Sequence, residues 1–423
     1  MSKAEKKELV PVLRFPEFRK AEEWKKNTFG GIATFFNGRA FKQEELLDAG
    51  KYRVLRVGNF FSNNEWYYSD LELEDNKYCE LGDLLYAWSA SFGPRIWQGE
   101  KVIYHYHIWK VIENRGINRQ FLFILLDFET EKMKSRSANG LGLMHITKGT
   151  IESWKCYLPR IEEQQKIADC LASIDELIAA QAKKFDALKT YKKGLMQQVF
   201  PAEGETIPKL RFPEFLEKGE WDFDEFDKLI DVVDGDRGTN YPKAEEFSES
   251  GFCLFLSAKN VTKNGFKFEV LQFITKEKDE ALRKGKLQRE DVVLTTRGSV
   301  GQFAYFTEGV PYENMRINSG MVILRVKSKK IVPDYLYAFS KSALLAMQIE
   351  NVSFGNAQQQ LTVAGIKKFP ICYPKPDEQQ KIADYLTSID ELITAQAQRL
   401  DYLKAHKKGL MQQLFPTMDE VGA

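Results

Sequence analysis

The stretch EQQKIADCLASIDELIAAQAKKFDALKTYKKGLMQQVFP (residues 163–201) occurs twice in the chain. Its second copy, EQQKIADYLTSIDELITAQAQRLDYLKAHKKGLMQQLFP, spans residues 378–416 and matches the first without a gap at 29 of 39 positions. A second pair of motifs lies upstream, where LRFPEF occurs at residues 13–18 and again at 210–215. Internal repeats of this kind indicate two copies of one structural unit.

The residues between these motifs diverge, but the two copies can still be aligned. Asn59 aligns with Asn260 at an offset of 201 residues, and GDLLYAWSASFG (82–93) aligns with EDVVLTTRGSVG (290–301) at an offset of 208. The long repeated stretches are offset by 215 residues. Because the offset grows along the chain, we expect the extra length of the second copy to lie in loops.

The repeated stretches have the pattern of coiled-coil helices. Their apolar residues alternate at spacings of four and three, which is a heptad seam. The seam residues are Ile167, Leu171, Ile174, Ile178, Leu188 and Leu195 in the first copy, and Ile382, Leu386, Ile389, Ile393, Leu403 and Leu410 in the second. Lys192 and Lys407 are polar seam positions, which limit register and partner choice. Roughly 36 helical residues span about 54 Å, so we expect a rod carrying two domains.

The divergent segments combine strand and helix signals. Strands rich in β-branched and aromatic residues are predicted at 52–57, 83–88, 102–112, 253–257, 291–296 and 321–326, with helices at 120–134 and 333–350. Such a mixture is typical of α/β or α+β domains. The predicted organisation is a first domain at residues 1–159, a helix at 160–201, a second domain at 202–374 and a helix at 375–423.

Polar turns recur after the aligned strands, and their sequences differ between the copies. Base edges and phosphates form hydrogen bonds with the side chains of Arg, Asn, Gln, Ser and His. Phosphates are also bound by lysine. The predicted DNA contacts are Arg56, Asn59, Ser89, Ser91, Arg95, His105 and His145 in the first copy, and Lys259, Asn260, Arg297, Ser299, Arg316, Asn318, Gln358 and Gln359 in the second. The alternative for any single residue of this set is that it lies in an ordinary loop with no role in DNA binding.

His105 and His107 have the spacing of two residues on one face of a strand. A metal ion there would need further ligands, which the sequence does not indicate. We therefore expect a structural or DNA-contacting pair and no metal site.

The chain lacks the motifs of several enzyme classes and of membrane proteins. It contains no GxxxxGK[ST] loop, no HExxH helix, no GxSxG turn and no acidic Pro-Pro-aromatic methyltransferase motif. No uncharged apolar run approaches the roughly 18 residues of a membrane span, and the N-terminus lacks a signal-peptide core. The five scattered cysteines favour a reducing compartment. We therefore expect a cytoplasmic protein that is no enzyme, binds no cofactor itself and does not contact a membrane.

Over essentially its whole length the chain resembles the specificity subunit of type I restriction–modification enzymes. The resemblance is carried by the paired LRFPEF elements, the EQQKIAD and SIDELI helical segments and the KKGLMQQ[VL]FP ends. It implies two target-recognition domains related by a pseudo-two-fold repeat, each reading one half of a bipartite sequence in double-stranded DNA. It also implies an antiparallel coiled coil that sets the spacer and docks two modification subunits.

The resemblance assigns all chemistry to partner subunits. The modification subunits would bind S-adenosylmethionine and methylate adenine N6, and restriction subunits would use ATP and Mg²⁺ for translocation and cleavage. Two alternatives remain open here: a self-contained DNA methyltransferase or nuclease fusion, and a coiled-coil adaptor with no role on DNA. The net charge of +1 is low for a DNA-binding protein, which implies that partners neutralise many of the phosphates.

Overall fold

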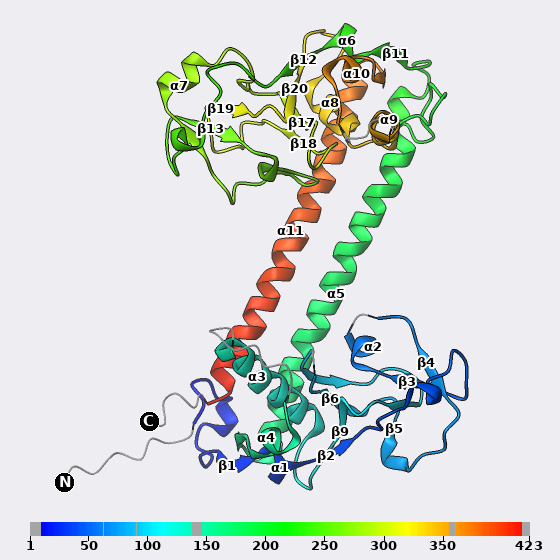
Figure 1. The fold of residues 1–423 in the computed structure, drawn as a ribbon, viewed down its shortest axis with the longest axis vertical. Helices are drawn as coiled ribbons and strands as arrows, with labels where there is room; N and C mark the ends of the chain where they lie inside the picture. Colours follow the sequence, from blue (N-terminus) through cyan, green and yellow to red (C-terminus); the bar gives the residue numbers. More distant parts are fainter. Residues whose placement is uncertain (1–9, 62, 90, 138–145, 355–359, 417–423) are drawn as a thin grey trace, which may run out of the picture. The chain divides into compact units, whose positions relative to one another are not determined.

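The computed structural model describes residues 10–61, 63–89, 91–137, 146–354 and 360–416. The chain folds into two compact units (Figure 1). The first unit consists of Met1–Ala182 and Arg399–Ala423, and the second of Lys183–Gln398. Each unit therefore contains one divergent segment, part of its own long helix and part of the long helix of the other copy.

A four-stranded antiparallel sheet forms the centre of each unit. In the first unit the order is β2-β9-β6-β7, with β2 (Ala33–Asn37), β9 (Ile108–Glu113), β6 (Leu84–Ala87) and β7 (Gly93–Ile96). In the second unit it is β12-β20-β17-β18, with β12 (Ile230–Asp234), β20 (Met321–Val326), β17 (Val292–Thr295) and β18 (Phe303–Tyr305). The two copies thus share one strand order.

A second sheet in each unit contains a parallel strand pair. The first unit has the order β4-β3-β8-β5, with β4 (Tyr67–Ser69), β3 (Tyr52–Leu55), β8 (Val102–Tyr104) and β5 (Tyr78–Cys79). The second has β16-β13-β19, with β16 (Phe273–Ile274), β13 (Cys253–Leu256) and β19 (Met315–Ile317). β3 runs parallel to β8, as β13 does to β19. The offsets of 201 and 208 residues expected from the alignment are those between β3 and β13 and between β6 and β17.

The remaining elements correspond only in part between the units. The first unit has β1 (Lys25–Thr28) paired with β10 (Lys155–Leu158), and helices α1 (Phe29–Ile32), α2 (Val57–Phe61), α3 (Arg119–Ser137) and α4 (Lys148–Ser153). The second has β11 (Asp222–Glu225) paired with β21 (Pro370–Tyr373), the short pair β14 (Val261–Thr262) and β15 (Gly265–Phe266), and helices α6 (Phe226–Leu229), α7 (Lys276–Ala281), α8 (Pro333–Ser340), α9 (Ala343–Phe354) and α10 (Val363–Lys367). The long helices are α5 (Ile161–Val199) and α11 (Pro376–Leu414).

Two predicted elements are each divided in the structure. The strand expected at 102–112 is interrupted because a turn joins β8 to β9, closed by the Ile108 amide donating to the His105 carbonyl at 2.9 Å. His105 and His107 therefore lie in this turn, and the prediction that they share a strand face was wrong. The helix expected at 333–350 divides into α8 and α9, where the Ser342 hydroxyl accepts a bond from the Leu345 amide.

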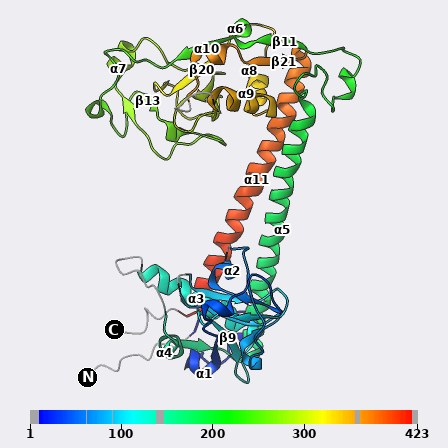
Figure 2. The same ribbon diagram turned by 45° about the vertical axis from the view of Figure 1, so that its right-hand side comes forward.

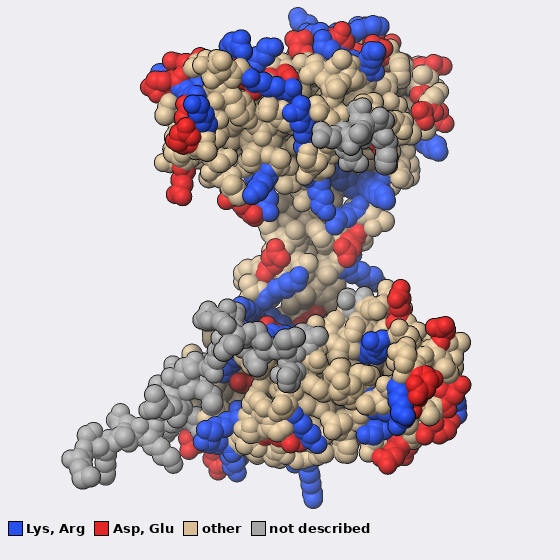
Figure 3. All heavy atoms as spheres, in the orientation of Figure 1, with Lys and Arg blue, Asp and Glu red and all other residues tan. Residues whose placement is uncertain are grey.

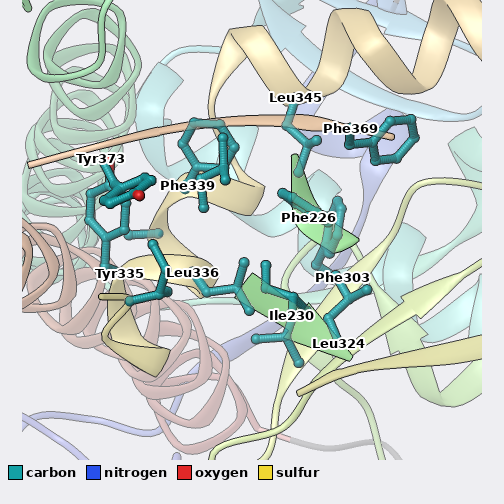
Figure 4. Packing of buried hydrophobic residues seen from close by; sticks show 14 of the residues in the cluster. Phe226, Ile230, Phe303, Leu324, Tyr335, Leu336, Phe339, Leu345, Phe369 and Tyr373 are labelled. Carbon is teal, nitrogen blue, oxygen red and sulfur yellow. The ribbon is translucent and has the colours of Figure 1, made fainter. Parts of the chain in front are cut away.

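The hydrophobic core of each unit includes the end of the long helix from the other copy. In the second unit, Tyr335 and Phe339 of α8 pack with residues of the central sheet (Figure 4), and Phe200 lies 5.8 Å from the Phe339 ring. In the first unit, Phe415 packs against Trp24 and Phe128, with centroids 6.1 and 5.0 Å away. Each copy thus completes the core of the other.

Within each copy, the LRFPEF motif binds the start of the long helix through a buried ion pair. Arg14 of the first LRFPEF motif donates two bonds, of 2.8 and 2.7 Å, to the carboxylate of Glu163 at the start of α5. Arg211 of the second motif donates two 2.7 Å bonds to Glu378 at the start of α11. All four side chains are nearly inaccessible to solvent. These pairs anchor each long helix to its own domain.

Within each unit the two long helices pack antiparallel (Figures 1 and 2). In the second unit the seam residue Lys192 pairs with Asp390, and the Tyr191 and Tyr385 hydroxyls lie 2.9 Å apart. In the first unit Lys407 pairs with Asp175 at 2.7 Å. The two lysines predicted to limit register therefore each meet an aspartate on the facing helix.

The predicted seam residues divide into two groups by burial. Those near the helix starts, together with Leu195, are buried; the six are Ile167, Leu171, Leu195, Ile382, Leu386 and Ile389. The others are half-buried, namely Ile174, Ile178, Leu188, Ile393, Leu403 and Leu410. Two helices alone leave part of each seam side chain in solvent, whereas the domain cores cover the ends of the helices.

Within the described residues no helix is long and apolar enough to span a membrane.

Candidate nucleic-acid interface

Four turns of the first unit meet along one border of its two sheets, which we call the first edge. They follow β2, β3, β6 and β8. The Arg39 amide donates to Tyr104 at 2.9 Å, and the His105 amide donates to Leu55 at 2.9 Å. The amide of Trp88, directly after β6, donates to the His107 carbonyl at 3.1 Å. Main-chain hydrogen bonds therefore hold the four turns together.

The corresponding turns of the second unit form the second edge. The Thr296 amide, directly after β17, donates to the Gly320 carbonyl at 2.8 Å. Arg237, in the turn after β12, donates from Nη2 to the Ser319 carbonyl at 3.2 Å. Since β13 and β19 are parallel, the turn after β13 opens at the same border. The two edges thus occupy equivalent places in the repeat.

Gly38 and Gly235 allow the turns at each edge to approach closely. A Cβ atom on Gly38 would lie 2.3 Å from the His105 carbonyl oxygen, and one on Gly235 would lie 2.2 Å from that of Asn318. No other residue fits such a contact with main chain. The two glycines align at an offset of 197 residues, so the internal repeat itself marks both turns.

Most of the described DNA-contact candidates of the first copy lie at or beside the first edge. Of these six residues, Arg56, Ser91 and Arg95 are exposed to solvent. Asn59, Ser89 and His105 are half-buried. The Arg56 guanidinium lies 5.0 Å from the Tyr67 ring centroid, and that of Arg95 lies 5.0 Å from Phe61. These cation–π contacts orient the two arginines while leaving them accessible.

In the second copy the structure separates exposed candidates from buried ones. Lys259, Arg297 and Ser299 are exposed, and Asn318 is half-buried with its Oδ1 accepting a 2.8 Å bond from the Gly320 amide. Arg297 and Ser299 belong to the turn between β17 and β18. These four residues are therefore available at the second edge or beside it.

Two of the predicted DNA contacts, Arg316 and Asn260, are buried in the structure. Arg316 is only 5% exposed; its Nε donates to Asp279 and its other nitrogens donate to main-chain carbonyls. Asn260 is buried, accepts from the Ser257 amide and donates to the Lys267 and Val270 carbonyls. Buried polar groups must find partners inside the protein, and these two have done so. In this conformation neither can reach DNA.

Asn59 has the same loop-closing role as its counterpart Asn260. Its Oδ1 accepts from the Arg56 amide at 3.3 Å, and its Nδ2 donates to the Asn63 and Glu65 carbonyls. His145, Gln358 and Gln359 lie outside the described residues. Close to them in sequence, the Ile146 amide donates to the Trp88 carbonyl at 2.9 Å, and the Leu361 amide donates to that of Thr296 at 3.1 Å.

The histidines of the first edge are neutral at physiological pH. Partial burial, with the nearby His107 and Arg56, lowers the pKa of His105 to about 4. Burial and Arg56 also lower the pKa of His107. Within the described residues, no group of three or more His, Cys, Asp or Glu side chains is arranged to hold a metal ion.

Several side chains at the two edges are absent from the predicted contacts. Arg39, Trp88 and Tyr106 lie at the first edge, and Arg237 lies at the second. The aligned motifs FNGR (36–39) and VDGDR (233–237) mark the turns after β2 and β12. Each motif ends in an arginine, Arg39 in the first copy and Arg237 in the second.

Charge alone does not mark an interface in this protein. On the face shown in Figure 3, basic and acidic side chains are interspersed over both units. Counterion release by basic side chains supplies much of the affinity of DNA-binding proteins. With a net charge of +1, the basic and acidic side chains of the chain nearly balance, so the net charge does not identify the interface.

The chain matches a family model described as the type I restriction modification DNA specificity domain. The match covers residues 21–190 and again 220–405. These two ranges follow the internal repeat, and each ends within a long helix.

Individual relatives agree with the family match. The chain is similar to the type I restriction enzyme MjaVIII specificity subunit of Methanocaldococcus jannaschii, at 26% identity over 90% of this chain and 96% of the relative. It is also similar to the EcoBI specificity subunit of Escherichia coli, at 19% identity over 85% and 78%. Its fold is similar to that of the S subunit of a type I restriction-modification system from M. genitalium, with a TM-score of 0.60 and 16% identity over 97% and 100%.

Proposed function

The chain belongs to the type I restriction–modification DNA specificity family, and from this premise we propose that it is the subunit that selects the DNA target. Each unit would read one half of a bipartite sequence in double-stranded DNA through its edge. The chain itself would be non-catalytic. Methylation and cleavage would belong to other subunits, which would also hold S-adenosylmethionine, ATP and Mg²⁺.

One observation carries this proposal: the two units are equal in framework and different at their edges. Both have the same strand order in the central sheet, a glycine at the turn after its first strand, and a buried Arg–Glu anchor. Yet His105, Tyr106 and His107 correspond to Asn318, Ser319 and Gly320. A protein that reads two different half-sites needs such a combination, because the bases are distinguished by side chains and not by the framework.

The long helices supply the proposed contacts with other subunits. Their sequences are nearly identical in the two copies, and identical surfaces suit two copies of one partner. We propose two modification subunits as these partners, with restriction subunits joining the assembly. The helices would also set the number of base pairs between the half-sites.

Exchange of one divergent segment tests the proposal. Residues 28–158 would be replaced by the corresponding segment of another specificity subunit, and adenine methylation would be mapped genome-wide in cells that also express the modification subunit. We expect one half of the methylated sequence to change while the other half and the gap stay the same.

Three results would contradict the proposal. An unchanged target would show that the segment does not read DNA. Methylation by the purified chain with S-adenosylmethionine alone would indicate an enzyme, and absence of DNA binding in every complex would indicate an adaptor. The chain without any exchange serves as the control, and it should give a bipartite motif that disappears when only this chain is removed.

A further inference from the structure

The first edge carries an exposed cluster of aromatic rings. Tyr106 is 39% exposed, and its ring centroid lies 3.9 Å from that of His107. The Trp88 ring lies 5.0 Å from His107 and 5.9 Å from Tyr106. Three rings from the turns after β6 and β8 therefore form one surface, which we call the aromatic cluster (Trp88, Tyr106 and His107).

The aromatic cluster is held rigidly from below. Trp88 stacks on Trp109 of β9 at 5.6 Å and 19°, and Trp109 stacks on Tyr86 of β6 at 5.9 Å and 20°. The Trp88 indole Nε1 donates a 2.8 Å bond to the Tyr106 carbonyl. A contact surface that is fixed before binding loses little conformational entropy when DNA arrives.

The cluster presents an uncharged surface to a ligand. The lowered pKa of His107, caused by burial and by Arg56, keeps its imidazole neutral near pH 7. Of the neighbouring arginines, Arg39 is paired with Glu45, whereas the exposed Arg56 keeps its charge beside the cluster. The Tyr106 ring therefore offers apolar contact more than charge attraction.

The second edge has a different chemistry at the same positions. Trp88 corresponds to Thr296, Tyr106 to Ser319 and His107 to Gly320. These positions carry no ring, and the exposed Arg297 follows Thr296 directly. The two edges thus differ in the kind of contact that they can make, apolar at the first and hydrogen-bonding at the second.

We propose that the aromatic cluster determines specificity in the first half-site by apolar contact with the 5-methyl group of a thymine in the major groove. The thymine methyl is the apolar group that base pairs present in this groove, and apolar side chains are its usual protein contacts. Tyr106 is the contacting residue; Trp88 and His107 position it. This inference rests on the proposed function and adds the chemistry by which one half-site is read.

Substitution of Tyr106 tests the inference in cells that express the modification subunit. Tyr106→Ala should relax one or two positions of the first half of the methylated motif, raising methylation of singly mismatched sites about tenfold relative to the matched site. The second half and the gap should not change. Tyr106→Phe keeps the ring and should preserve the motif. Leu81→Ala is the matched control, because Leu81 is 69% exposed and precedes β6 at the strand end opposite Trp88.

A binding measurement with the purified complex identifies the contacted group. Replacing thymine by uracil in the first half-site removes only the methyl group, and we expect this to weaken binding several-fold for the natural chain and not for Tyr106→Ala. Uracil in the second half-site should have a smaller effect on both chains. Equal binding of thymine and uracil DNA by the natural chain would overturn the inference.

The outcomes separate this inference from the proposed function. A uniform loss of methylation with Tyr106→Ala, with the motif unchanged, would assign the cluster to subunit docking and overturn the inference alone. If Tyr106→Ala leaves both the amount of methylation and the two halves of the motif unchanged, the inference is likewise overturned, and the proposed function is not affected. Absence of any motif with the natural chain would instead overturn the proposed function.

Discussion

Single residues that are identical in the two copies have mainly structural roles. Arg14 and Arg211 lie in the repeated LRFPEF motifs and bind Glu163 and Glu378 in the interior. A buried ion pair costs solvation on both sides, so losing one partner leaves an uncompensated charge. Repetition of these residues therefore reflects the need to anchor a helix.

Glu163→Gln should destabilise the first unit by about 3–5 kcal/mol, since Arg14 would stay buried without its carboxylate partner. Chemical unfolding followed by hydrogen exchange in each unit would measure the loss. Glu17→Gln is the control, because the Glu17–Lys166 pair of the same unit is exposed and should contribute nothing measurable. Equal stability of the two variants would refute the buried-pair interpretation.

His105 makes the stability of the first unit depend on pH. Its pKa is lowered to about 4 in the folded chain, whereas an unfolded histidine titrates near 6.5. The unfolded state therefore binds the proton first as the pH falls, and this group's contribution to stability decreases between about pH 6.5 and 4. His105→Asn should reduce the slope of unfolding free energy against pH in this range. An unchanged slope would exclude His105 as its source.

At the scale of elements, charged residues on the two long helices determine how the helices pair with each other. Lys192 and Asp175 on α5 are 17 residues apart, as are Asp390 and Lys407 on α11. The two Lys–Asp pairs are therefore consistent with one antiparallel register.

Leu188 and Leu403 are only half-buried. Truncating either to alanine should therefore lower the free energy of unfolding by about 1 kcal/mol, which is less than the loss expected for a fully buried leucine.

Removing one heptad from the middle of both helices (residues 179–185 and 397–403) should shorten the gap between the methylated half-sites by about three base pairs. Seven residues correspond to about 10 Å of helix, and DNA rises about 3.4 Å per base pair. Both Lys–Asp pairs are retained in this variant. The deletion in α5 alone shifts the facing residues and should abolish methylation. A gap that stays constant after the double deletion would refute the helices as the spacer.

At the scale of the whole molecule, each domain depends on the distant copy for part of its core. Phe415, near the end of the described chain, packs against Trp24 in the first unit. Phe200 packs against Tyr335 and Phe339 in the second. Folding of the first unit thus requires the far end of the chain, whereas Phe200 directly precedes the second unit's own domain in sequence.

Phe415→Ala should destabilise the first unit by about 3–5 kcal/mol, and Phe200→Ala should do the same to the second. Hydrogen exchange resolved by peptide would locate each effect. The exposed Phe223 provides a control, whose replacement by alanine should change neither unit appreciably. If Phe415→Ala increased exchange only near the C-terminus itself, the helix end would not be part of the first unit's core.

The candidate site was predicted only in part. The exposed residues Arg56, Lys259 and Arg297 follow strands that the sequence pattern identified, whereas Arg95, expected in a turn, lies in β7. Arg316 has the same residue type, yet it lies within β19 and is buried against Asp279. Sequence pattern does not say which arginine finds an acidic partner, because Asp279 is 37 residues away along the chain.

The sequence by itself determined the repeat, the two long helices, the positions of most strands and the family. These follow from periodicity and internal identity, which are local or directly readable along the chain. Only the tertiary structure decided that His105 to His107 form a turn, that Gly38 and Gly235 bring separate turns into contact, and that each helix end completes the other copy's core. These features depend on contacts between residues far apart in sequence, and no local pattern specifies which distant surfaces meet.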